Sequence, residues 1–208
     1  MKIINNKIAI YGGSFNPPTK GHIEVIKTVS PYVDEVWVIP VKNHAWNKEL
    51  VSFEDRINML SLIYNDGCDG KVKIIAVQGM KKVPQKTQPF MKWLKKNTNQ
   101  DNEYHIVIGS DNAVQINKWY KWKQLCKENK FIIVKRGSRT VNFDTKPFNG
   151  SIMCLNDECE SGCSSTEIRG MINDNWMLKE AEKWVHPKVM NYIKEKKLYG
   201  YKNNYKRR

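Results

Sequence analysis

The sequence predicts an α/β fold in which a mostly parallel sheet carries helices on both faces. Strand-like apolar runs alternate with helix-like stretches along the chain, which is the pattern of βαβ units. A Gly-rich turn at residues 12–21 follows the first strand-like run, and a second turn at residues 109–111 follows the fourth. Ligands of such folds bind beyond the carboxyl ends of the strands, near a switch point, so both turns lie where a site is expected.

The individual elements follow in order along the chain. We expect strands at residues 7–11, 35–41, 72–77, 105–108, 131–135 and 151–155. We expect helices at residues 22–29, 52–64, 89–96, 111–116, 122–128, 166–172, 177–183 and 187–196. The stretches 78–87 and 137–150 are expected to be loops. Since no repeat or linker divides the chain, its 208 residues are expected to form one domain, with residues 198–208 as a frayed basic end.

The first turn carries the clearest chemical signal. Residues 12–22 read Gly-Gly-Ser-Phe-Asn-Pro-Pro-Thr-Lys-Gly-His between a predicted strand and a predicted helix. The glycines let the main chain approach a ligand closely. His22 falls in the first helical turn, where N–H groups and the helix dipole favour anions. Taken alone, the stretch is better explained as a plain βα turn, because short motifs misfire often.

A second signal far along the chain changes this balance. Residues 164–169 read Ser-Ser-Thr-Glu-Ile-Arg, in which Ser164 and Glu167 fit a capping box. The N–H groups and hydroxyls of this helix start, together with Arg169, are suited to hold a phosphate. A well-capped helix with a surface arginine explains the segment equally well. Two such helix starts in one small α/β chain together indicate a polyphosphate ligand.

These segments resemble signatures of the nucleotidylyltransferase superfamily. The first is similar to Gly-x-Phe-x-Pro-x-(His/Thr)-x-Gly-His, and the second to Ile-Ser-Ser-Thr-x-x-Arg, with Cys163 in place of Ile. Residues 108–111, Ile-Gly-Ser-Asp, and 117–120, Asn-Lys-Trp-Tyr, resemble the Gly-x-Asp and Thr-Trp-Tyr segments of nicotinate/nicotinamide mononucleotide adenylyltransferases. The resemblance runs from about residue 7 to residue 199, nearly the whole chain.

The resemblance implies a Rossmann-like fold and an enzyme of NAD biosynthesis. Its reaction transfers the adenylyl group of ATP to nicotinate mononucleotide, or also to nicotinamide mononucleotide, and releases pyrophosphate. Mg²⁺ would bridge the ATP phosphates, since it prefers phosphate oxygens and water to a protein cage. The expected partners are these small molecules. The enzyme is expected to act in the cytoplasm and not to associate with a membrane. A homo-oligomer is possible.

The resemblance also implies roles for single residues. His22 and Thr19 are the catalytic residues, which hold the α-phosphate and stabilise charge as pyrophosphate leaves. The ATP-binding residues are Gly12, Gly13, Ser14, Phe15, Gly21, His22, Lys48, Gly109, Asp111, Ser165, Thr166 and Arg169. The mononucleotide-binding residues are Ser14, Phe15, Lys48, Thr87 and Trp119. Trp119 is expected to stack on the pyridine ring.

Two departures bear on the subfamily. Thr19 replaces the first histidine of the bacterial His-x-Gly-His form, and Thr occurs there in eukaryotic nicotinamide enzymes and in phosphopantetheine adenylyltransferases. Residues 84–87, Pro-Gln-Lys-Thr, stand where the bacterial family usually has Ser-Tyr-Thr, so Lys86 replaces a Tyr. The alternatives are therefore, in order, a phosphopantetheine adenylyltransferase, a cytidylyltransferase and a non-catalytic basic protein that binds nucleic acid.

Composition favours the small-molecule interpretation. The net charge is +14, but 29 of the 35 basic residues are Lys, and they are scattered. We therefore favour a solvated basic surface over a nucleic-acid interface. No apolar run approaches the length of a membrane span, and the first strand begins almost at once, so neither a membrane span nor a signal peptide is expected. The five Cys do not complete a zinc set, so reduced thiols are expected.

Several conspicuous side chains receive ordinary interpretations. Trp37 is predicted to be core, and Arg56 a solvated helix residue. His105 and His186 are predicted to be structural, whereas His44, in the loop after the second strand, could touch a phosphate. Tyr120 and Trp122 are expected in the core or at the rim of the site.

Overall fold

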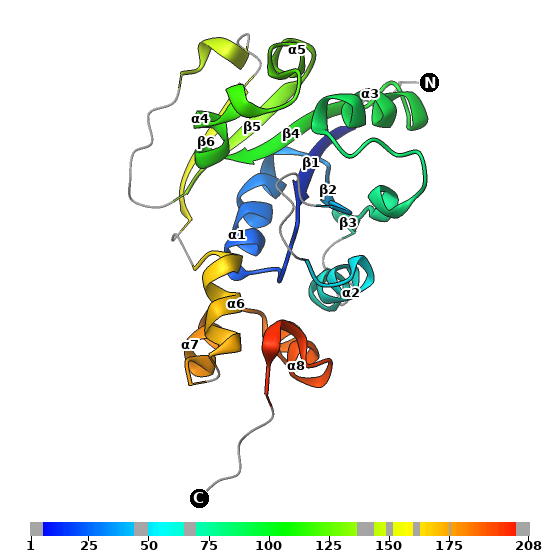
Figure 1. Ribbon diagram of the computed structural model, residues 1–208. Coiled ribbons are helices and arrows are strands. Elements are labelled where there is room, and N and C mark those ends of the chain that lie inside the picture. The colour runs from blue at the N-terminus through cyan, green and yellow to red at the C-terminus, as the bar shows by residue number, and fades with distance from the viewer. Residues whose placement is uncertain are drawn as a thin grey trace, which may run out of the picture.

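The computed structural model describes residues 6–43, 50–64, 70–136, 144–148, 152–159, 163–174 and 176–202. Its centre is a six-stranded sheet with strand order β3-β2-β1-β4-β5-β6, and every neighbouring pair is parallel (Figure 1). The strands are β1 (Lys7–Gly13), β2 (Glu35–Pro40), β3 (Val72–Ile74), β4 (Glu103–Gly109), β5 (Lys130–Arg136) and β6 (Ile152–Cys159). The predicted parallel α/β fold is confirmed.

The position of β1 in the sheet creates a switch point. β1 pairs with β2 from Ile8↔Glu35 to Gly13↔Pro40, and with β4 from Lys7↔Glu103 to Ile10↔Ile106. The chain therefore builds outward from β1 to β3 on one side and then continues from β4 to β6 on the other. The turns that follow β1 and β4 consequently lie side by side at the carboxyl edge, where such sheets bind ligands.

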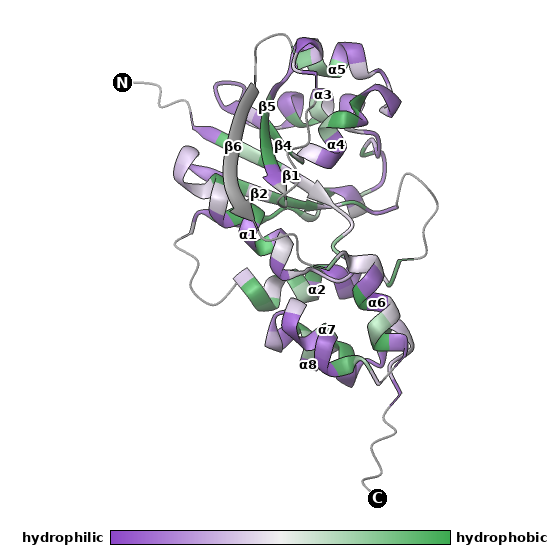
Figure 2. Ribbon diagram, turned by 90° about the vertical axis from the view of Figure 1, so that its left-hand side faces the viewer, coloured by the Kyte–Doolittle hydropathy of each residue, from purple (hydrophilic) through white to green (hydrophobic). Residues whose placement is uncertain are grey.

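Helices cover both faces of this sheet, because side chains alternate along each strand. One face packs Ile10, Ile106 and Ile133 against α3 and α5, and the other packs Ala9, Val107 and Ile132 against α1 and α2. Figure 2 shows the apolar strands enclosed between these helical layers. The helices are α1 (Lys20–Val29), α2 (Phe53–Tyr64), α3 (Thr87–Asn97), α4 (Ser110–Val114), α5 (Trp122–Glu128), α6 (Ser165–Asn173), α7 (Leu178–Trp184) and α8 (Pro187–Glu195).

The C-terminal helices form a third apolar cluster. Ile168 and Ile172 of α6, Val185, and Val189 of α8 pack together and against Met59 of α2. In Figure 1 these helices, orange to red, lie beyond the sheet next to α1 and α2. The packing fixes α6 relative to α2, and so brings the second motif toward the carboxyl edge of the sheet.

The predicted frayed end is wrong for the residues that the structure describes. Leu198, Tyr199 and Tyr201 pack against the C-terminal cluster, and Leu198–Gly200 form a 3₁₀ turn. Their aromatic and aliphatic side chains outweigh the basic character of this stretch, because burial of apolar surface offsets the cost of ordering it. Residues 203–208 lie outside the described residues.

Element boundaries differ from prediction by a few residues. β3 ends at Ile74 because residues 76–79 turn into a 3₁₀ helix. α4 ends at Val114, and a 3₁₀ turn at Ile116–Lys118 completes the predicted helix. In the predicted loop 137–150, Lys146–Phe148 form a 3₁₀ turn, and residues 137–143 and 149–150 lie outside the described part.

Most of the ordinary side-chain interpretations hold. Trp37 is half-buried against the α3–α5 cluster and donates to Glu35 at 2.6 Å. His105 is buried and bonded to Glu103, and burial lowers the pKa of its imidazole. His186 caps α8 by accepting from the N–H of Lys188 at 3.3 Å.

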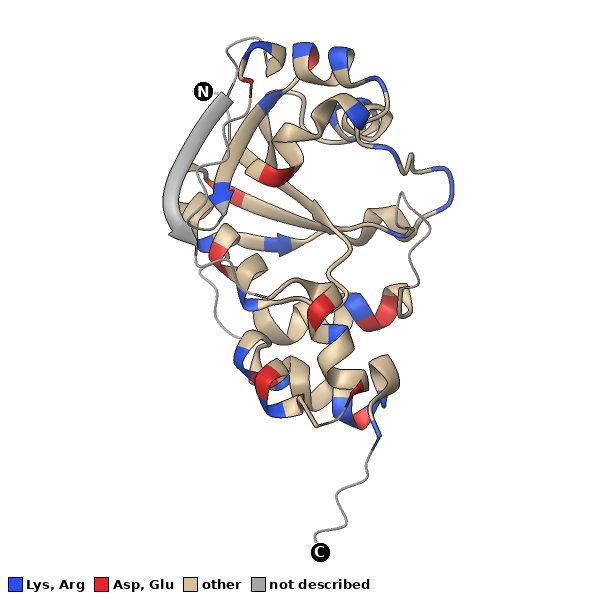
Figure 3. Cartoon of the chain, turned by 60° about the vertical axis from the view of Figure 1, so that its left-hand side comes forward, with Lys and Arg blue, Asp and Glu red and all other residues tan. Residues whose placement is uncertain are grey.

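Charge is spread over the surface. Figure 3 shows Lys and Arg on helices at both ends of the molecule, interspersed with Asp and Glu. Several of the lysines are paired with acidic groups, such as Lys130 with Glu103 at 2.7 Å and Lys73 with Glu35 at 2.6 Å. In the described part of the chain, no helix has the length and apolar character needed to span a membrane.

Candidate active site

The turn after β1 is built around the buried ring of Phe15. Phe15 has a left-handed backbone, with φ of 48°, and is 0% exposed. Its ring packs edge-on against Tyr11, at 5.6 Å between centroids, and against the imidazole of His22 at 5.1 Å. A Cβ on Gly13 would lie only 3.0 Å from this ring, a tight contact that a larger residue would relieve only by displacing the ring. The predicted contribution of Phe15 to ligand binding therefore falls to its backbone, since its side chain is core.

His22 is both a helix cap and a candidate catalytic group. Thr19 is the N-cap of α1, and its N–H donates to Nδ1 of His22 at 3.0 Å, while its hydroxyl oxygen lies 2.8 Å from the same atom. The N–H of His22 donates in return to the Thr19 hydroxyl oxygen at 3.4 Å. Because Nδ1 accepts a backbone N–H, the neutral imidazole carries its proton on Nε2. The pair thus presents His22 as a hydrogen-bond donor through Nε2.

The start of α6 is bonded directly to the first motif. Ser165 donates its hydroxyl to the carbonyl of Pro17 at 3.0 Å, across 148 residues of sequence. Arg169 donates from Nη1 to the carbonyls of Asn16 at 2.9 Å and Ser165 at 3.1 Å, and from Nη2 to the Thr166 hydroxyl at 3.3 Å. The two predicted phosphate motifs therefore lie side by side and are hydrogen-bonded to each other.

The predicted capping box at the start of α6 is present. The hydroxyl of Ser164 accepts the N–H of Glu167 at 3.3 Å, and the Glu167 carboxylate accepts the N–H of Ser164 at 2.8 Å. These hydrogen bonds from Ser164 lower the pKa of Glu167. The box fixes the first turn of α6, on which Ser165 and Thr166 lie.

Arg56 contradicts its prediction as a solvated helix residue. It is 1% exposed, and its guanidinium donates to four carbonyls: Ser14 at 2.9 Å, Val41 at 2.7 Å, Lys42 at 3.0 Å and Val51 at 3.3 Å. Burial lowers the pKa of this guanidinium, although arginine stays charged at neutral pH. One side chain thus ties the turns after β1 and β2 to the start of α2.

The Arg56 contacts were missed because each of its partners is a backbone carbonyl. The residue stands at a helix position that the capping box of Ser52 and Asp55 marks as a first turn, and such positions are usually solvated. Every residue has a main-chain carbonyl, so no sequence pattern predicts which carbonyls a buried arginine will contact. The sequence marks Arg56 only by its residue type, because most basic residues of this chain are Lys.

The carboxyl end of β4 supplies the second wall of the predicted site. Gly109 is the N-cap of α4, Ser110 is buried, and Asp111 is exposed in the first helical turn. These residues follow the fourth strand, as predicted, and the structure shows that this strand pairs with β1. The ribose contacts expected for Gly109 and Asp111 remain a prediction.

A third group of predicted residues gathers where α3 begins. The ammonium of Lys86 lies 4.3 Å from the centre of the Tyr120 ring, so the residue before Thr87 contacts the residue after Trp119. Trp119 is half-buried against the α3–α5 cluster, and Tyr120 is exposed. Trp119 therefore has a supported position and retains some free surface.

Lys48 and His44 lie outside the described residues. Gly21 is half-buried, and a Cβ there would lie 3.6 Å from the Thr19 hydroxyl oxygen, an ordinary contact. Gly12 is exposed at the end of β1. The structure thus brings the described site residues to the carboxyl edge in three groups, around His22, Asp111 and Thr87.

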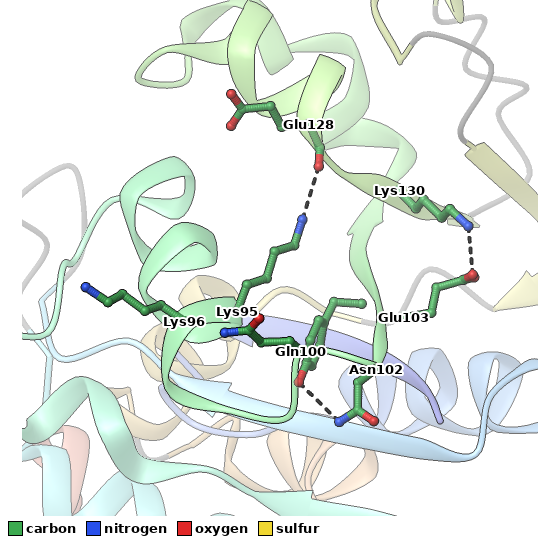
Figure 4. Close-up of a pocket in the computed structure, with 8 residues that line it drawn as sticks. Lys95, Lys96, Gln100, Asn102, Glu103, Glu128 and Lys130 are labelled. Carbon is green, nitrogen blue, oxygen red and sulfur yellow. Dashed lines mark hydrogen bonds and ion pairs between the residues drawn. The ribbon is translucent and has the colours of Figure 1, made fainter. Parts of the chain in front are cut away.

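A cavity of about 520 Å³ lies elsewhere, at the amino edge of the sheet (Figure 4). It is lined by Glu103 and Lys130, which begin β4 and β5, and two of its three lysines are engaged: Lys130 with Glu103, and Lys95 with the carbonyl of Glu128 at 3.1 Å. None of the predicted site residues lines it. The candidate site is therefore defined by converging motifs rather than by this cavity.

The sequence matches the cytidylyltransferase-like family over residues 10–171, which contain both phosphate motifs and the Gly109–Asp111 turn. The chain belongs to this family. The superfamily resemblance inferred from the motifs is confirmed. The match covers every described residue of the predicted site.

Named relatives narrow the family further. The chain is 32% identical to a probable nicotinate-nucleotide adenylyltransferase of Caldicellulosiruptor saccharolyticus, over 93% of this chain and 98% of that one. It is 29% identical to the nicotinate-nucleotide adenylyltransferase of Bacillus subtilis, with the same coverage. The structure is similar to that of Plasmodium falciparum nicotinic acid mononucleotide adenylyltransferase complexed with NaAD, with a TM-score of 0.83, 25% identity, and coverage of 95% and 99%.

The contacts of Arg56 generate the first prediction. Arg56→Met should lower the free energy of unfolding by about 2–4 kcal/mol, because it leaves several buried carbonyls without a donor. Arg56→Lys should recover part of this loss, since an ammonium cannot reach all four acceptors. Denaturant unfolding measures both, with Glu54→Gln on the exposed side of α2 as the control. Equal stability of Arg56→Met and the native chain would contradict the structural role.

Proposed function

We propose that this chain transfers the adenylyl group of ATP to nicotinate mononucleotide, forming the dinucleotide and releasing pyrophosphate in NAD biosynthesis. The observation that carries the proposal is the direct bonding of α6 to the turn after β1, through Ser165 and Arg169. It unites two helix starts of the kind that bind phosphates next to His22. The relatives that carry the name nicotinate-nucleotide adenylyltransferase support the same reaction.

The chemical task is in-line attack of one phosphate on another. Both reactants are anionic, so positioning and charge neutralisation dominate. In our proposal the Nε2–H of His22 donates to the α-phosphate and stabilises charge as pyrophosphate leaves. Thr19 keeps the imidazole in the tautomer that can donate. Residues 12–15 contribute backbone N–H groups and the Ser14 hydroxyl at the phosphates.

The remaining ATP contacts follow from the two other groups of residues. Arg169, Ser165 and Thr166 are proposed to bind the β- and γ-phosphates, with Lys48 assisting. Gly109 and Asp111 are proposed to contact ribose. The substrate in this proposal is ATP carrying Mg²⁺. Among the described residues no three His, Cys, Asp or Glu gather as metal ligands, and Mg²⁺ on a nucleotide would be held by phosphate oxygens and water.

The alternatives are weaker. A phosphopantetheine adenylyltransferase shares Thr-x-Gly-His and the closing Ser-Ser, but lacks the Gly-x-Asp and Trp segments that this chain carries at residues 109–119. A cytidylyltransferase has a different closing motif. A non-catalytic nucleic-acid binder would need a steep salt dependence of duplex binding. Pyrophosphate release from ATP with each acceptor in turn separates these possibilities, and release with neither pyridine mononucleotide would refute the proposal. We also propose that the chain forms a single domain and acts in the cytoplasm.

The proposed role of His22 predicts a large kinetic effect. His22→Ala should lower turnover by about 10²–10³, the usual effect of losing one charge-stabilising donor. Loss of the helix cap should cost only about 1 kcal/mol of stability, so the fold should survive. Lys20→Ala, exposed in the same turn, is the control. Turnover near the native value in a folded His22→Ala protein would remove His22 from the mechanism.

The proposed role of Arg169 predicts a selective effect. Arg169→Ala should raise the KM for ATP much more than the KM for the mononucleotide, because only ATP brings a triphosphate to α6. Arg169→Lys should rescue it only in part, since the forked geometry of the guanidinium is lost. Steady-state kinetics with each substrate varied, and Lys179→Ala on exposed α7 as control, measure this. Equal changes in both KM values would argue against a triphosphate contact.

The position of Lys86 beside Tyr120 predicts a preference between the two acceptors. Nicotinate mononucleotide should be used with higher kcat/KM than the amide, because its carboxylate can be held by Lys86 and by N–H groups at the start of α3. Trp119→Ala should lower kcat/KM for both acceptors, whereas Lys86→Tyr should change kcat/KM mainly for the acid. Lys118→Ala, at an exposed position, is the control. Preference for the amide would refute the substrate assignment, and an unchanged Trp119→Ala enzyme would return Trp119 to a packing role.

A further inference from the structure

Tyr199, near the C-terminus, reaches back to the turn after β1. Its hydroxyl donates to Oδ1 of Asn16 at 2.9 Å, across 183 residues of sequence. Asn16 is 1% exposed, and its Oδ1 also accepts the N–H of Val51 at 3.2 Å. One buried amide oxygen thus joins the turn after β1, the segment before α2 and the C-terminal segment.

The backbone around Tyr199 is held in an unfavourable conformation. Lys197 and Tyr199 have φ of 52° and 58°, in the left-handed region that non-glycine residues rarely adopt. Such conformations persist where the surroundings over-determine them, and they cluster at functional sites. At Gly200 a Cβ would collide with Oδ1 of Asn173, so this segment is pressed against the end of α6. The C-terminal segment is therefore fixed to the same helix that carries Arg169.

The surroundings of the phenol keep it a donor. Burial raises the pKa of Tyr199 above its ordinary value, although the nearby charges of Arg169 and Arg56 act in the opposite direction. The neutral hydroxyl can therefore donate to Asn16 at any physiological pH. The main-chain carbonyl of Asn16 in turn accepts from Nη1 of Arg169 at 2.9 Å. Asn16 thus links the two residues: its side-chain oxygen accepts from Tyr199 and its main-chain carbonyl accepts from Arg169.

We infer that Tyr199 is a positioning residue for the triphosphate site: by holding Asn16, it fixes the carbonyl that orients Arg169. The inference rests on the proposed function, because it assigns Arg169 to the ATP phosphates. Phosphate-binding geometry depends on the direction of the guanidinium fork, so a small turn of the Asn16 peptide misaligns it. The C-terminal segment thus completes the ATP site without touching the nucleotide.

The test removes only the hydroxyl. Tyr199→Phe should raise the KM for ATP about tenfold, with less than a twofold change in kcat and in the KM for the mononucleotide. Tyr192→Phe is the matched control, because its hydroxyl donates to Asp55 at 2.8 Å, also between the C-terminal helices and α2, but does not contact Asn16. Both variants should lose similar thermal stability. A rise in the KM for ATP with Tyr192→Phe as large as with Tyr199→Phe would show a merely structural effect and overturn the inference.

A second measurement separates the link through Asn16 from general loosening. In an Arg169→Ala background, Tyr199→Phe should cause no further rise in the KM for ATP, because the residue it positions is gone. A full additional tenfold rise there would overturn the link to Arg169.

A direct measurement of nucleotide binding separates the inference about Tyr199 from the proposed function. Calorimetry with a non-hydrolysable ATP analogue needs no acceptor, so it reports the triphosphate site alone. Weaker binding by Tyr199→Phe supports the inference even if the acceptor is not nicotinate mononucleotide. Equal binding by the native chain and Tyr199→Phe overturns the inference alone, whereas no binding by the native chain overturns the proposed function and, with it, the inference.

Discussion

The site depends on one buried cation that holds four backbone carbonyls. Arg56 fixes the turn after β1 relative to the turn after β2 and the start of α2. Without that clamp the carbonyl of Ser14 would have no donor from α2, and the loop would lose its link to the helix layer on which α8 also packs. An electrostatic anchor of this kind also leaves positive charge beneath the turn where anionic ligands are proposed to bind, without contacting them directly.

The sequence predicted the mostly parallel sheet and the two motifs that the structure brings together, because these depend on local patterns. Apolar periodicity located the strands, and Ser164 with Glu167 announced the start of α6. It failed for Arg56 and Tyr199, whose partners are a set of carbonyls and an amide from distant segments. It also missed the second role of His22, because a capping box is sought with Glu or Gln at the third helical position. Contacts of polar side chains with distant segments produce no periodic pattern in the sequence, so they cannot be predicted from it.

The residues proposed to bind phosphate are engaged with the protein itself. Ser165 and Arg169 bond to the carbonyls of Pro17 and Asn16, which fixes the relative position of the two motifs before any nucleotide arrives. Such a site has already met much of the entropic cost of ordering its side chains, which is the general advantage of preorganisation. It also means that substitutions at these positions alter the shape of the site as well as its contacts.

The bond from the Thr19 N–H to His22 has a consequence for the behaviour of the protein in acid. An imidazolium carries a proton on both nitrogens and cannot accept a hydrogen bond. Protonation of His22 must therefore release the N–H of Thr19, and the new proton on Nδ1 then faces the Thr19 hydroxyl oxygen 2.8 Å away. The main-chain bonds from His22 and Ile23 to the Thr19 carbonyl do not involve the ring, so the start of α1 keeps them. Acidification thus exchanges one partner of the imidazole for another and places a positive charge on the residue that we propose contacts the α-phosphate.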